Sequence, residues 1–460
     1  MDRRLFIKNS AVLLGAVGMM RQDLHPLMID RNMNLINITS CDSNFEREKL
    51  RIPFGFKGGY LTELWQVVSQ LKSERGNVGL GLGTQSVLYG DANVFEQNSE
   101  AGGNALMYVL ANKALHMLTG RSFSNPIDLL DSILPQVYEE AQRLTGRGDV
   151  NINFVYNALI SVDNALWMLY AKENNVRKLS ELVPHPYKEA FAYRQSKIAV
   201  MFQISYDMPL SDIRAAAAQG YFVFKIKTGF PGTQEEMLKK DMHRLKEIHY
   251  ILKDVHTTQT ESGRVYYTMD ANGRYESKEH LQKYLDYMRE IGAFEYTLLY
   301  EEPFVEANQD DVSDLGLMIA ADESIHTEED AYRKIQLGYS AFVLKGIAKT
   351  LSMTVKIAAI AHAHGIPCLC ADLTVNPILI DWNKMVAASM QPFPKINMGM
   401  METNGDMNYV NWATMRSRHP FYGAPWTMVT QGVFHLDAQF YEVSGGIFEQ
   451  SDYYQNLLHQ

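Results

Sequence analysis

Five charged residues each close a short apolar run in the second half of the chain, and each is followed by turn residues. They are Lys227, Asp270, Glu301, Asp322 and Lys345. One charged residue at the end of a strand is usually just its first solvated position. Five of them on five consecutive apolar runs instead predict that these side chains gather in a single site.

The three acids predict a metal site. Asp270, Glu301 and Asp322 end adjacent runs, with no histidine or cysteine beside them. Ligand sets made only of oxygen suit Mg²⁺, with Mn²⁺ as the second choice. Glu302 directly follows Glu301, but successive residues of a strand face opposite sides, so only one of these two can be a ligand.

Two of the lysines are close neighbours. In YFVFKIKTGF (221–230), Lys225 and Lys227 stand two residues apart, so on a strand they point to the same face. Lysine is rarely buried unless its charge is compensated. We expect Lys227, nearer the strand end, to act as an acid/base. Lys225 should disfavour a second charge and lower the pKa of this partner.

Two interpretations of the lysine positions are open. In a ring of eight strands, the second and sixth strands, which carry Lys227 and Lys345, face each other. A substrate between them would have an acid/base group on each side, which is what inversion at carbon through a planar intermediate requires. Alternatively, the lysines only neutralise the three acids, which explains the charge balance but not the placement on both flanks.

The elements that must position these residues alternate in type from about residue 195. Eight apolar runs predict strands at 198–205, 221–227, 265–270, 296–301, 317–322, 341–345, 366–372 and 395–402. Amphipathic segments between them predict helices, among them 235–253, 277–292 and 352–365. Eight strands with intervening helices are typical of a (β/α)8 barrel, whose catalytic groups lie at the C-terminal ends of the strands. A doubly wound open sheet is the alternative, but no glycine-rich phosphate loop follows any strand.

Composition excludes several classes of protein. The chain has 460 residues, 46% hydrophobic and 21% charged, with a net charge of -10. This acidic balance argues against a general nucleic-acid binder, which needs a basic face. No apolar run reaches the roughly 18 residues of a membrane-spanning helix, so we expect no stable membrane span.

The first residues predict export. MDRRLFIKNSAVLLGAVGMM has a basic start followed by a modestly apolar stretch, the layout of a signal peptide. Arg3 and Arg4, followed by Leu-Phe-Ile-Lys, resemble the twin-arginine signal. We therefore expect a periplasmic protein. An ordinary secretory signal and an uncleaved anchor are the alternatives.

The motifs together resemble the enolase superfamily, in its muconate-lactonizing and dipeptide-epimerase-like subgroup. They are KIK (225–227), DAN (270–272), YEEP (300–303), ADES (321–324) and Lys345. Upstream, NVGLGLGTQSVLYGD (77–91) and ALISVDNALWMLYAKENN (158–175) are similar to parts of that family's cap. Matching by motif makes Asp270, Glu301 and Asp322 the Mg²⁺ ligands, Lys227 and Lys345 the acid/base pair, and Lys225 their helper.

The resemblance also implies the fold. We expect a (β/α)7β TIM-type barrel with an α+β N-terminal capping domain that the C-terminal tail completes. The boundaries we predict are a twin-arginine-like signal peptide at 1–24, a linker at 25–46, the capping domain at 47–192, the barrel at 193–402, and a C-terminal segment, 403–460, packing on the cap.

The chemistry that the resemblance implies is removal of the proton α to a carboxylate, through an enediolate that Mg²⁺ stabilises. Dipeptide epimerases of the family carry Asp-x-Asp near the end of the eighth strand, whereas this chain reads MMETNGDMN (400–408) there. Asp372, Glu402 and Asp406 are candidates to replace that pair, and Asn272 is a further candidate for substrate binding.

Export indicates the substrate, because cell-wall peptides with L-Ala and D-Glu are available outside the cytoplasm. We therefore expect an isomerase, an epimerase of a dipeptide such as Ala-Glu, acting as a homo-oligomer on this small-molecule carboxylate. A lyase or cycloisomerase of the muconate or succinylbenzoate-synthase type is the alternative. A non-catalytic binding protein on the same scaffold ranks last, because both flanking lysines are present.

Overall fold

The computed structural model describes residues 35–56 and 59–460. The predicted signal peptide and the first part of the predicted linker lie outside these residues. Among the helices of the described residues, none is long and apolar enough to cross a membrane.

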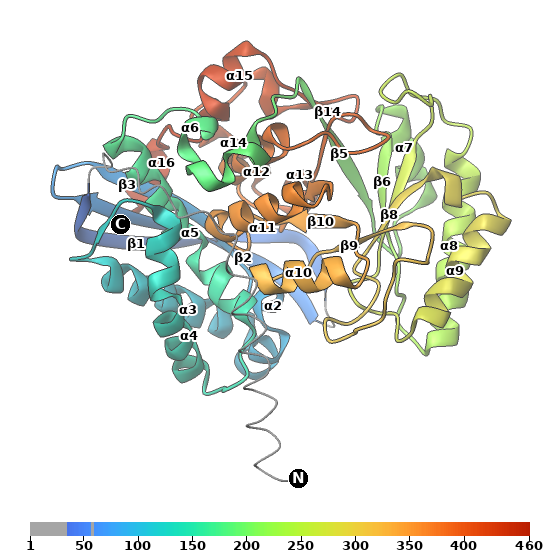
Figure 1. Cartoon of the computed structure of the whole chain (residues 1–460), viewed down its shortest axis with the longest axis horizontal. Coiled ribbons are helices and arrows are strands. Elements are labelled where there is room, and N and C mark those ends of the chain that lie inside the picture. The colour runs from blue at the N-terminus through green and yellow to red at the C-terminus, as the bar shows by residue number, and fades with distance from the viewer. Residues whose placement is uncertain (1–34, 57–58) are drawn as a thin grey trace, which may run out of the picture. The chain divides into compact units, whose positions relative to one another are not determined.

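An antiparallel sheet and a set of helices form the N-terminal cap. The sheet has the order β3-β2-β1-β4, with β1 (Ile36–Phe56), β2 (Gly59–Ser73), β3 (Val78–Gln85) and β4 (Ser122–Phe123). The helices that accompany it (Figure 1) are α2 (Val87–Gly90), α3 (Ala92–Leu118), α4 (Pro126–Thr145), α5 (Ile152–Glu173), α6 (Leu179–Leu182) and the 3-10 helix η2 (His185–Phe191).

The first half of β1 is a correction to the predicted linker. Residues 36–46 form strand, not linker: Ile36 and Asn37 pair with β4, and the pairing with β2 begins at Ile38 and places Cys41 opposite Leu71. Ile36 and Ile38 are buried in the core. Because polar residues alternate with a few buried apolar ones, this strand has the composition of a solvated segment although one face packs on the core.

Glycines let β3 pack directly against the long helix α5. Gly79, Gly81 and Gly83 alternate along the strand, so they share one face. A methyl group at Gly81 would overlap the backbone of Ser161 and Ala165. The glycine repeat of this segment is therefore explained by close approach of a helix.

Eight parallel strands form a closed barrel. They are β5 (Lys197–Ile204), β6 (Val223–Lys227), β7 (Tyr266–Asp270), β8 (Thr297–Glu301), β9 (Met318–Ala321), β10 (Ala341–Leu344), β11 (Cys368–Cys370) and β12 (Gly399–Glu402). Each pairs with the next, and β12 pairs back to β5 with Gly399 opposite Ile198. This closure confirms the predicted barrel and excludes the open sheet.

Helices connect the strands on the outside of the barrel (Figure 1). They are α7 (Leu210–Ala218), α8 (Gln234–Leu252), α9 (Lys278–Glu290), α10 (Glu328–Gln336), α11 (Leu351–Ala363) and α12 (Pro377–Ser389), with η3 (Phe294–Tyr296) before β8. The helices predicted at 235–253, 277–292 and 352–365 are α8, α9 and α11. One connection differs from the expected pattern, because residues 302–317, all described, contain no helix between β8 and β9.

The C-terminal segment joins the cap to the barrel. Its elements are α13 (Gly405–Asn408), α14 (Trp412–Ser417), η4 (Pro425–Thr427), β13 (Val429–Thr430), β14 (Val433–His435), α15 (Ala438–Glu442), η5 (Ser444–Gly446) and α16 (Asp452–Leu457). Arg418 forms ion pairs with Glu46 and Glu48 of β1, at 2.6 and 3.1 Å. The segment also contacts the barrel, because β14 pairs antiparallel with the start of β5.

A buried contact fixes the cap helix α5 to the barrel helix α11. The carboxylate of Asp163 accepts hydrogen bonds from the backbone N–H and the hydroxyl of Ser352, at 3.0 and 2.5 Å. The indole N–H of Trp167 donates to the same hydroxyl at 3.0 Å. Ser352 lies in the first turn of α11, so the cap holds the end of this helix that is nearest the rim of the barrel.

Candidate active site

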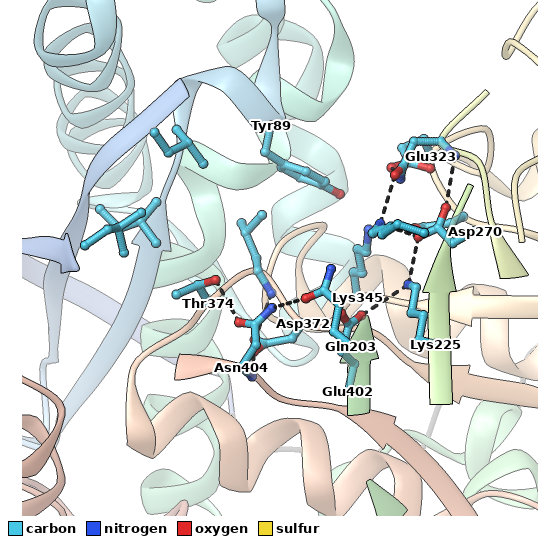
Figure 2. Close-up of a pocket in the computed structure, with 17 residues that line it drawn as sticks. Tyr89, Gln203, Lys225, Asp270, Glu323, Lys345, Asp372, Thr374, Glu402 and Asn404 are labelled. Carbon is cyan, nitrogen blue, oxygen red and sulfur yellow. Dashed lines mark hydrogen bonds and ion pairs between the residues drawn. The ribbon is translucent and has the colours of Figure 1, made fainter. Parts of the chain in front are cut away.

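A cavity lies between the C-terminal rim of the barrel and the cap. Its lining includes Lys225, Lys227, Asp270, Asp322 and Lys345 from the strand ends. Figure 2 shows polar side chains of the rim grouped around this cavity, with Tyr89 from the cap across from them. Glu301, the remaining predicted ligand, is fully buried and is connected to the rim through Lys225.

Lys225 is the hub of the buried charges. Its Nζ lies 3.0 Å from Asp270 Oδ2, 2.9 Å from Glu301 Oε1 and 3.2 Å from Glu402 Oε2. Burial by itself would lower the pKa of Lys225, but these carboxylates outweigh it and hold that pKa well above its ordinary value. Lys225 therefore stays charged and links three strand ends; its expected effect on Lys227 stays a prediction.

Lys227 occupies one flank of the cavity. It donates to Asp270 Oδ2 at 2.5 Å and to Asn272 Oδ1 at 2.8 Å. The amide of Asn272 in turn donates to Glu323 Oε1 at 2.9 Å. Burial raises the pKa of Asp270, but the ammonium groups of Lys225 and Lys227 outweigh it and bring that pKa below its usual range.

Lys345 occupies the other flank. It forms an ion pair with Asp322, and its Nζ lies 5.2 Å from the ring centroid of Tyr89, which belongs to α2 of the cap. Behind this pair, the buried Lys349 donates to the backbone carbonyls of Asp322 and Ile325. Burial would lower the pKa of Lys345, but the Asp322 carboxylate outweighs it, so that pKa is raised.

The two flanks stand on opposite sides of the barrel. Lys227 ends β6 and Lys345 follows β10, and these strands are four places apart in the closed ring of eight. The acids Asp270, Glu301 and Asp322 end or follow the strands between them. The structure thus brings together all the residues predicted for the chemistry.

Asp270, Glu301 and Asp322 offer the oxygen ligands that a hard cation prefers, but they also form ion pairs with lysines. Glu301 Oε2 and Asp322 Oδ1 are buried and accept no hydrogen bond from the described residues. Burial and the neighbouring Asp270 raise the pKa of Glu301 well above its ordinary value, a cost that a cation would relieve. In the described part of the chain, no three His, Cys, Asp or Glu side chains are arranged to hold an ion as they stand. An ion would compete with Lys225 for the oxygens of Asp270 and Glu301.

Glu302 faces away from Glu301, as the strand alternation predicts. Its φ of 37° lies in the left-handed region. Its carboxylate accepts the backbone N–H of Asp322 at 2.7 Å and the hydroxyl of Ser324 at 3.0 Å. Burial, with Glu323 nearby, raises the pKa of Glu302 to about 7. Glu302 therefore supports the loop that carries Asp322 from behind.

The carboxylates predicted for substrate binding are already engaged. Asp372 accepts backbone N–H groups of Leu373 and Asn404, each at 2.8 Å, and burial raises its pKa to about 7. Glu402 is paired with Lys225. Both line the cavity, as does Asn272, whereas Asp406 lines a different one.

The rest of the cavity wall consists of amides and cap side chains. Asn404 donates to Gln203 Oε1 at 3.0 Å and accepts the hydroxyl of Thr374 at 2.7 Å. Opposite the rim, the cap contributes an apolar wall made of Leu50, Leu61, Leu64 and Tyr89. A bound molecule would therefore meet charge at the lysines, neutral amides beside them, and apolar surface at the cap.

Several residues in and around the cavity were not predicted from the sequence. Lys349 follows Lys345 by four residues and Glu323 follows Asp322 by one, so adjacency to a predicted residue was an available signal. Tyr89 lies within the cap segment 77–91 and Gln203 within the predicted strand 198–205, but nothing in their residue types marks them as site residues.

The barrel matches a known family in sequence. Residues 211–414 match the family model described as enolase C-terminal domain-like. No curated protein is similar enough in sequence to match the chain. The resemblance to the enolase superfamily that the motifs indicate is thereby confirmed on the barrel, where the candidate site lies.

Solved structures share the fold. A mandelate racemase/muconate lactonizing protein from Herpetosiphon aurantiacus has a TM-score of 0.63 at 16% identity, covering 89% of this chain and 97% of that one. A dipeptide epimerase from Enterococcus faecalis V583, complexed with Mg and the dipeptide L-Leu-L-Tyr, has a TM-score of 0.57 at 16% identity, covering 81% and 92%. The 2-chloromuconate cycloisomerase from Rhodococcus opacus 1CP has a TM-score of 0.60 at 19% identity, covering 87% and 94%. The described cap and barrel are therefore those of this superfamily's fold.

Proposed function

From the premise that its barrel is an enolase C-terminal domain-like barrel, we propose that this protein is a Mg²⁺-dependent racemase or epimerase that removes the proton α to a carboxylate. One observation carries the proposal. Lys227 and Lys345 stand on opposite strands of the ring, with Asp270, Glu301 and Asp322 between them. A carbon held between these lysines can lose a proton from one face and gain one on the other.

The chain's own residues have distinct tasks in this proposal. One of Lys227 and Lys345, as the free amine, takes the α-proton, and the other, as the ammonium, returns a proton to the opposite face. Because Asp322 raises the pKa of Lys345, the free amine would form there only when a cation takes over the Asp322 carboxylate. Lys225 stays charged and holds Asp270 and Glu301 in place. Asp270, Glu301 and Asp322 would hold Mg²⁺, which when bound binds the substrate carboxylate and stabilises the negative charge that develops as the proton leaves. The cap side chains exclude water from the reacting carbon.

A dipeptide such as Ala-Glu is the first candidate substrate. The apolar cap wall fits a side chain or a peptide backbone over the rim, and one structural relative was solved with a dipeptide and Mg. This likeness is one of fold, so the substrate is our proposal.

A second candidate is an N-acylated amino acid, and a specific observation favours it. Asp372 and Glu402 are both engaged, so neither stands ready to bind the ammonium group of a dipeptide. Gln203 and Asn404, which are hydrogen-bonded to each other at 3.0 Å, give this part of the wall neutral amides, and these suit an acyl amide better than an ammonium group, since a buried amide needs hydrogen-bond partners and not charge.

Deuterium exchange tests the function and separates the candidates. The protein would be incubated in D₂O and Mg²⁺ with dipeptides, N-acylated amino acids and acid sugars, each in both configurations, followed by mass spectrometry. We expect one deuterium at the α-carbon of a dipeptide or an N-acylated amino acid, and none when a chelator removes Mg²⁺. A complete absence of exchange, with every carboxylate offered, would contradict the proposal.

We also propose that the chain is exported by the twin-arginine route and acts in the periplasm as a homo-oligomer. The export part of the proposal rests on Arg3 and Arg4 and on the modestly apolar stretch that follows them. Changing both to lysine should leave precursor in the cytoplasm, since that machinery recognises the pair. Normal export of the double variant would favour a general secretory route, and light scattering would test the oligomer.

A further inference from the structure

A second cavity lies behind β12, outside the candidate active site. It has a volume of about 340 Å³ and is lined by α12 and by the C-terminal segment between residues 403 and 434. At the end of β12 the chain contributes to both cavities: Glu402 and Asn404 line the active-site cavity, whereas Thr403 and Asp406 line this one. Its volume is at the lower end of the roughly 300–1,000 Å³ of small-molecule sites.

Buried charges form a fixed floor for this cavity. Lys384 Nζ binds Asp381 Oδ1 and the carbonyl oxygen of Trp426, the latter at 2.7 Å, and lies 4.0 Å from the ring centroid of Phe434. His419 Nε2 lies 2.7 Å from Asp381 Oδ2, and its Nδ1 accepts a backbone N–H at 2.9 Å. These contacts hold α12 to the C-terminal segment.

Two charges on the wall are left without an ion-pair partner. Arg416 of α14 contacts only the sulfur of Met428 and the ring of Tyr422 through its guanidinium. Asp406 of α13 accepts backbone N–H groups of its own turn, and the guanidinium groups of Arg51 and Arg416 act on it electrostatically from nearby. Within the described residues, neither forms a salt bridge, either with the other or elsewhere. The cavity therefore presents one positive and one negative group to whatever enters it.

The rest of the wall is largely aromatic and apolar. Tyr221, Trp412, Phe434 and Ile380 belong to its lining. A methyl group at Gly405 would overlap the Trp412 ring, so this glycine lets the ring lie against the turn that carries Asp406. Rigid rings beside a charged pair suit a ligand with an apolar body and two opposite charges.

We propose that this cavity binds a free α-amino acid with an apolar or aromatic side chain. Its carboxylate would pair with Arg416, whose planar guanidinium matches a carboxylate with two hydrogen bonds. Its ammonium group would pair with Asp406, and its side chain would lie on the rings. The site uses none of the rim lysines, so it stands independently of the function proposed above.

Calorimetric titration of the full protein with L-phenylalanine, N-acetyl-L-phenylalanine and L-phenylalaninamide tests the proposal. We expect L-phenylalanine to bind, and each derivative, which lacks one of the two charges, to bind at least about 10-fold more weakly. The proposal is overturned if L-phenylalanine does not bind at concentrations up to about 10 mM, or if all three ligands bind equally well.

Variants locate the binding. Arg416→Gln and Asp406→Asn should each weaken L-phenylalanine binding by at least about 10-fold. Arg333→Gln, at an exposed arginine of α10, is the matched control and should keep the affinity, as should Lys227→Ala. Affinity lost in Lys227→Ala but kept in Arg416→Gln would place the amino acid at the rim and overturn the proposal.

Discussion

The two flanks of the candidate active site use the same residue type in different surroundings. The side chain of Lys227 is 14% exposed and binds Asp270 and Asn272, both from the barrel. The side chain of Lys345 is 7% exposed and is packed between Asp322 and the ring of Tyr89, which comes from the cap. We call these the open flank and the closed flank.

The comparison shows where the cap reaches the chemistry. On the closed flank, the loop after Lys345 carries Lys349 and leads into α11, whose first turn is held by Asp163 of the cap. On the open flank, the lysine is held by barrel residues. Changes that loosen the cap or its anchor should therefore impair the closed flank more than the open one.

The largest effect should follow from Asp270→Asn, because Asp270 binds both Lys225 and Lys227 and is a proposed metal ligand. We expect turnover to fall on the order of 10³-fold or more, with weaker Mg²⁺ binding and an intact barrel. Titration with Mg²⁺ and circular dichroism check the two parts. Unchanged Mg²⁺ affinity in this variant and in Glu301→Gln would mean that the metal site lies elsewhere.

Asp163, which anchors the closed flank to the cap, should make the free energy of unfolding depend on pH. Burial raises the pKa of Asp163 to about 6, from an unfolded value near 3.9. The stability gained from its neutral form is present below about pH 4 and is lost as the pH rises through about 6.

Asp163→Asn removes this dependence. Between about pH 4 and about pH 7, its unfolding free energy should shift relative to wild type by up to about 3 kcal/mol, in favour of the variant at the higher pH. Urea denaturation at several pH values measures the shift. A pH-independent difference between the two proteins would show that Asp163 is charged in the folded state throughout this range.

Lys349→Met tests the closed flank without changing a rim side chain. Lys349 holds the backbone of the loop that carries Asp322, so its loss should lower turnover by about 10- to 100-fold, the usual cost of removing a group that orients a ligand. Lys384→Met is the matched control, since Lys384 is a buried lysine of α12 that is paired with Asp381 away from the rim. Equal losses of turnover in both variants would mean that the effect is one of stability.

The smallest effect should come from the open flank. Asn272→Gly removes the amide that binds Lys227 and Glu323, and glycine tolerates the φ of 45° at this position. Because Asp270 still binds Lys227, we expect turnover to fall only several-fold, on the order of one lost hydrogen bond. A loss larger than that of Lys349→Met would reverse the order of the two flanks.

The sequence predicted the barrel well because its strands are buried on both faces. Each of the eight predicted runs overlaps an observed strand, and the charged residues that close them mark the rim. Residues 36–46 were predicted as linker because a strand with one solvated face can consist mostly of polar residues. No sequence signal predicted that the connection between β8 and β9 lacks a helix, because this segment only connects two strands.

The site was predictable where chemistry demands a residue type. Three acids and three lysines at or near strand ends predict one shared site through their residue types alone. By contrast, Tyr89 and Gln203 line the cavity only because the fold brings their segments there. The backbone N–H groups that donate to Asp372 are placed by the conformation of a loop. Contacts of this kind depend on distances between segments far apart in the chain, which residue types do not encode.

The measurement that tests the two-lysine account most directly is α-proton exchange in D₂O with each stereoisomer of a substrate that wild type epimerises. Lys227→Ala should stop exchange from one isomer and Lys345→Ala from the other, each by about 10²- to 10⁴-fold. Arginine should rescue neither, because its guanidinium stays protonated. If one lysine variant keeps full exchange and turnover with both isomers, two-base epimerisation is wrong, and a lyase or cycloisomerase using a single lysine takes its place.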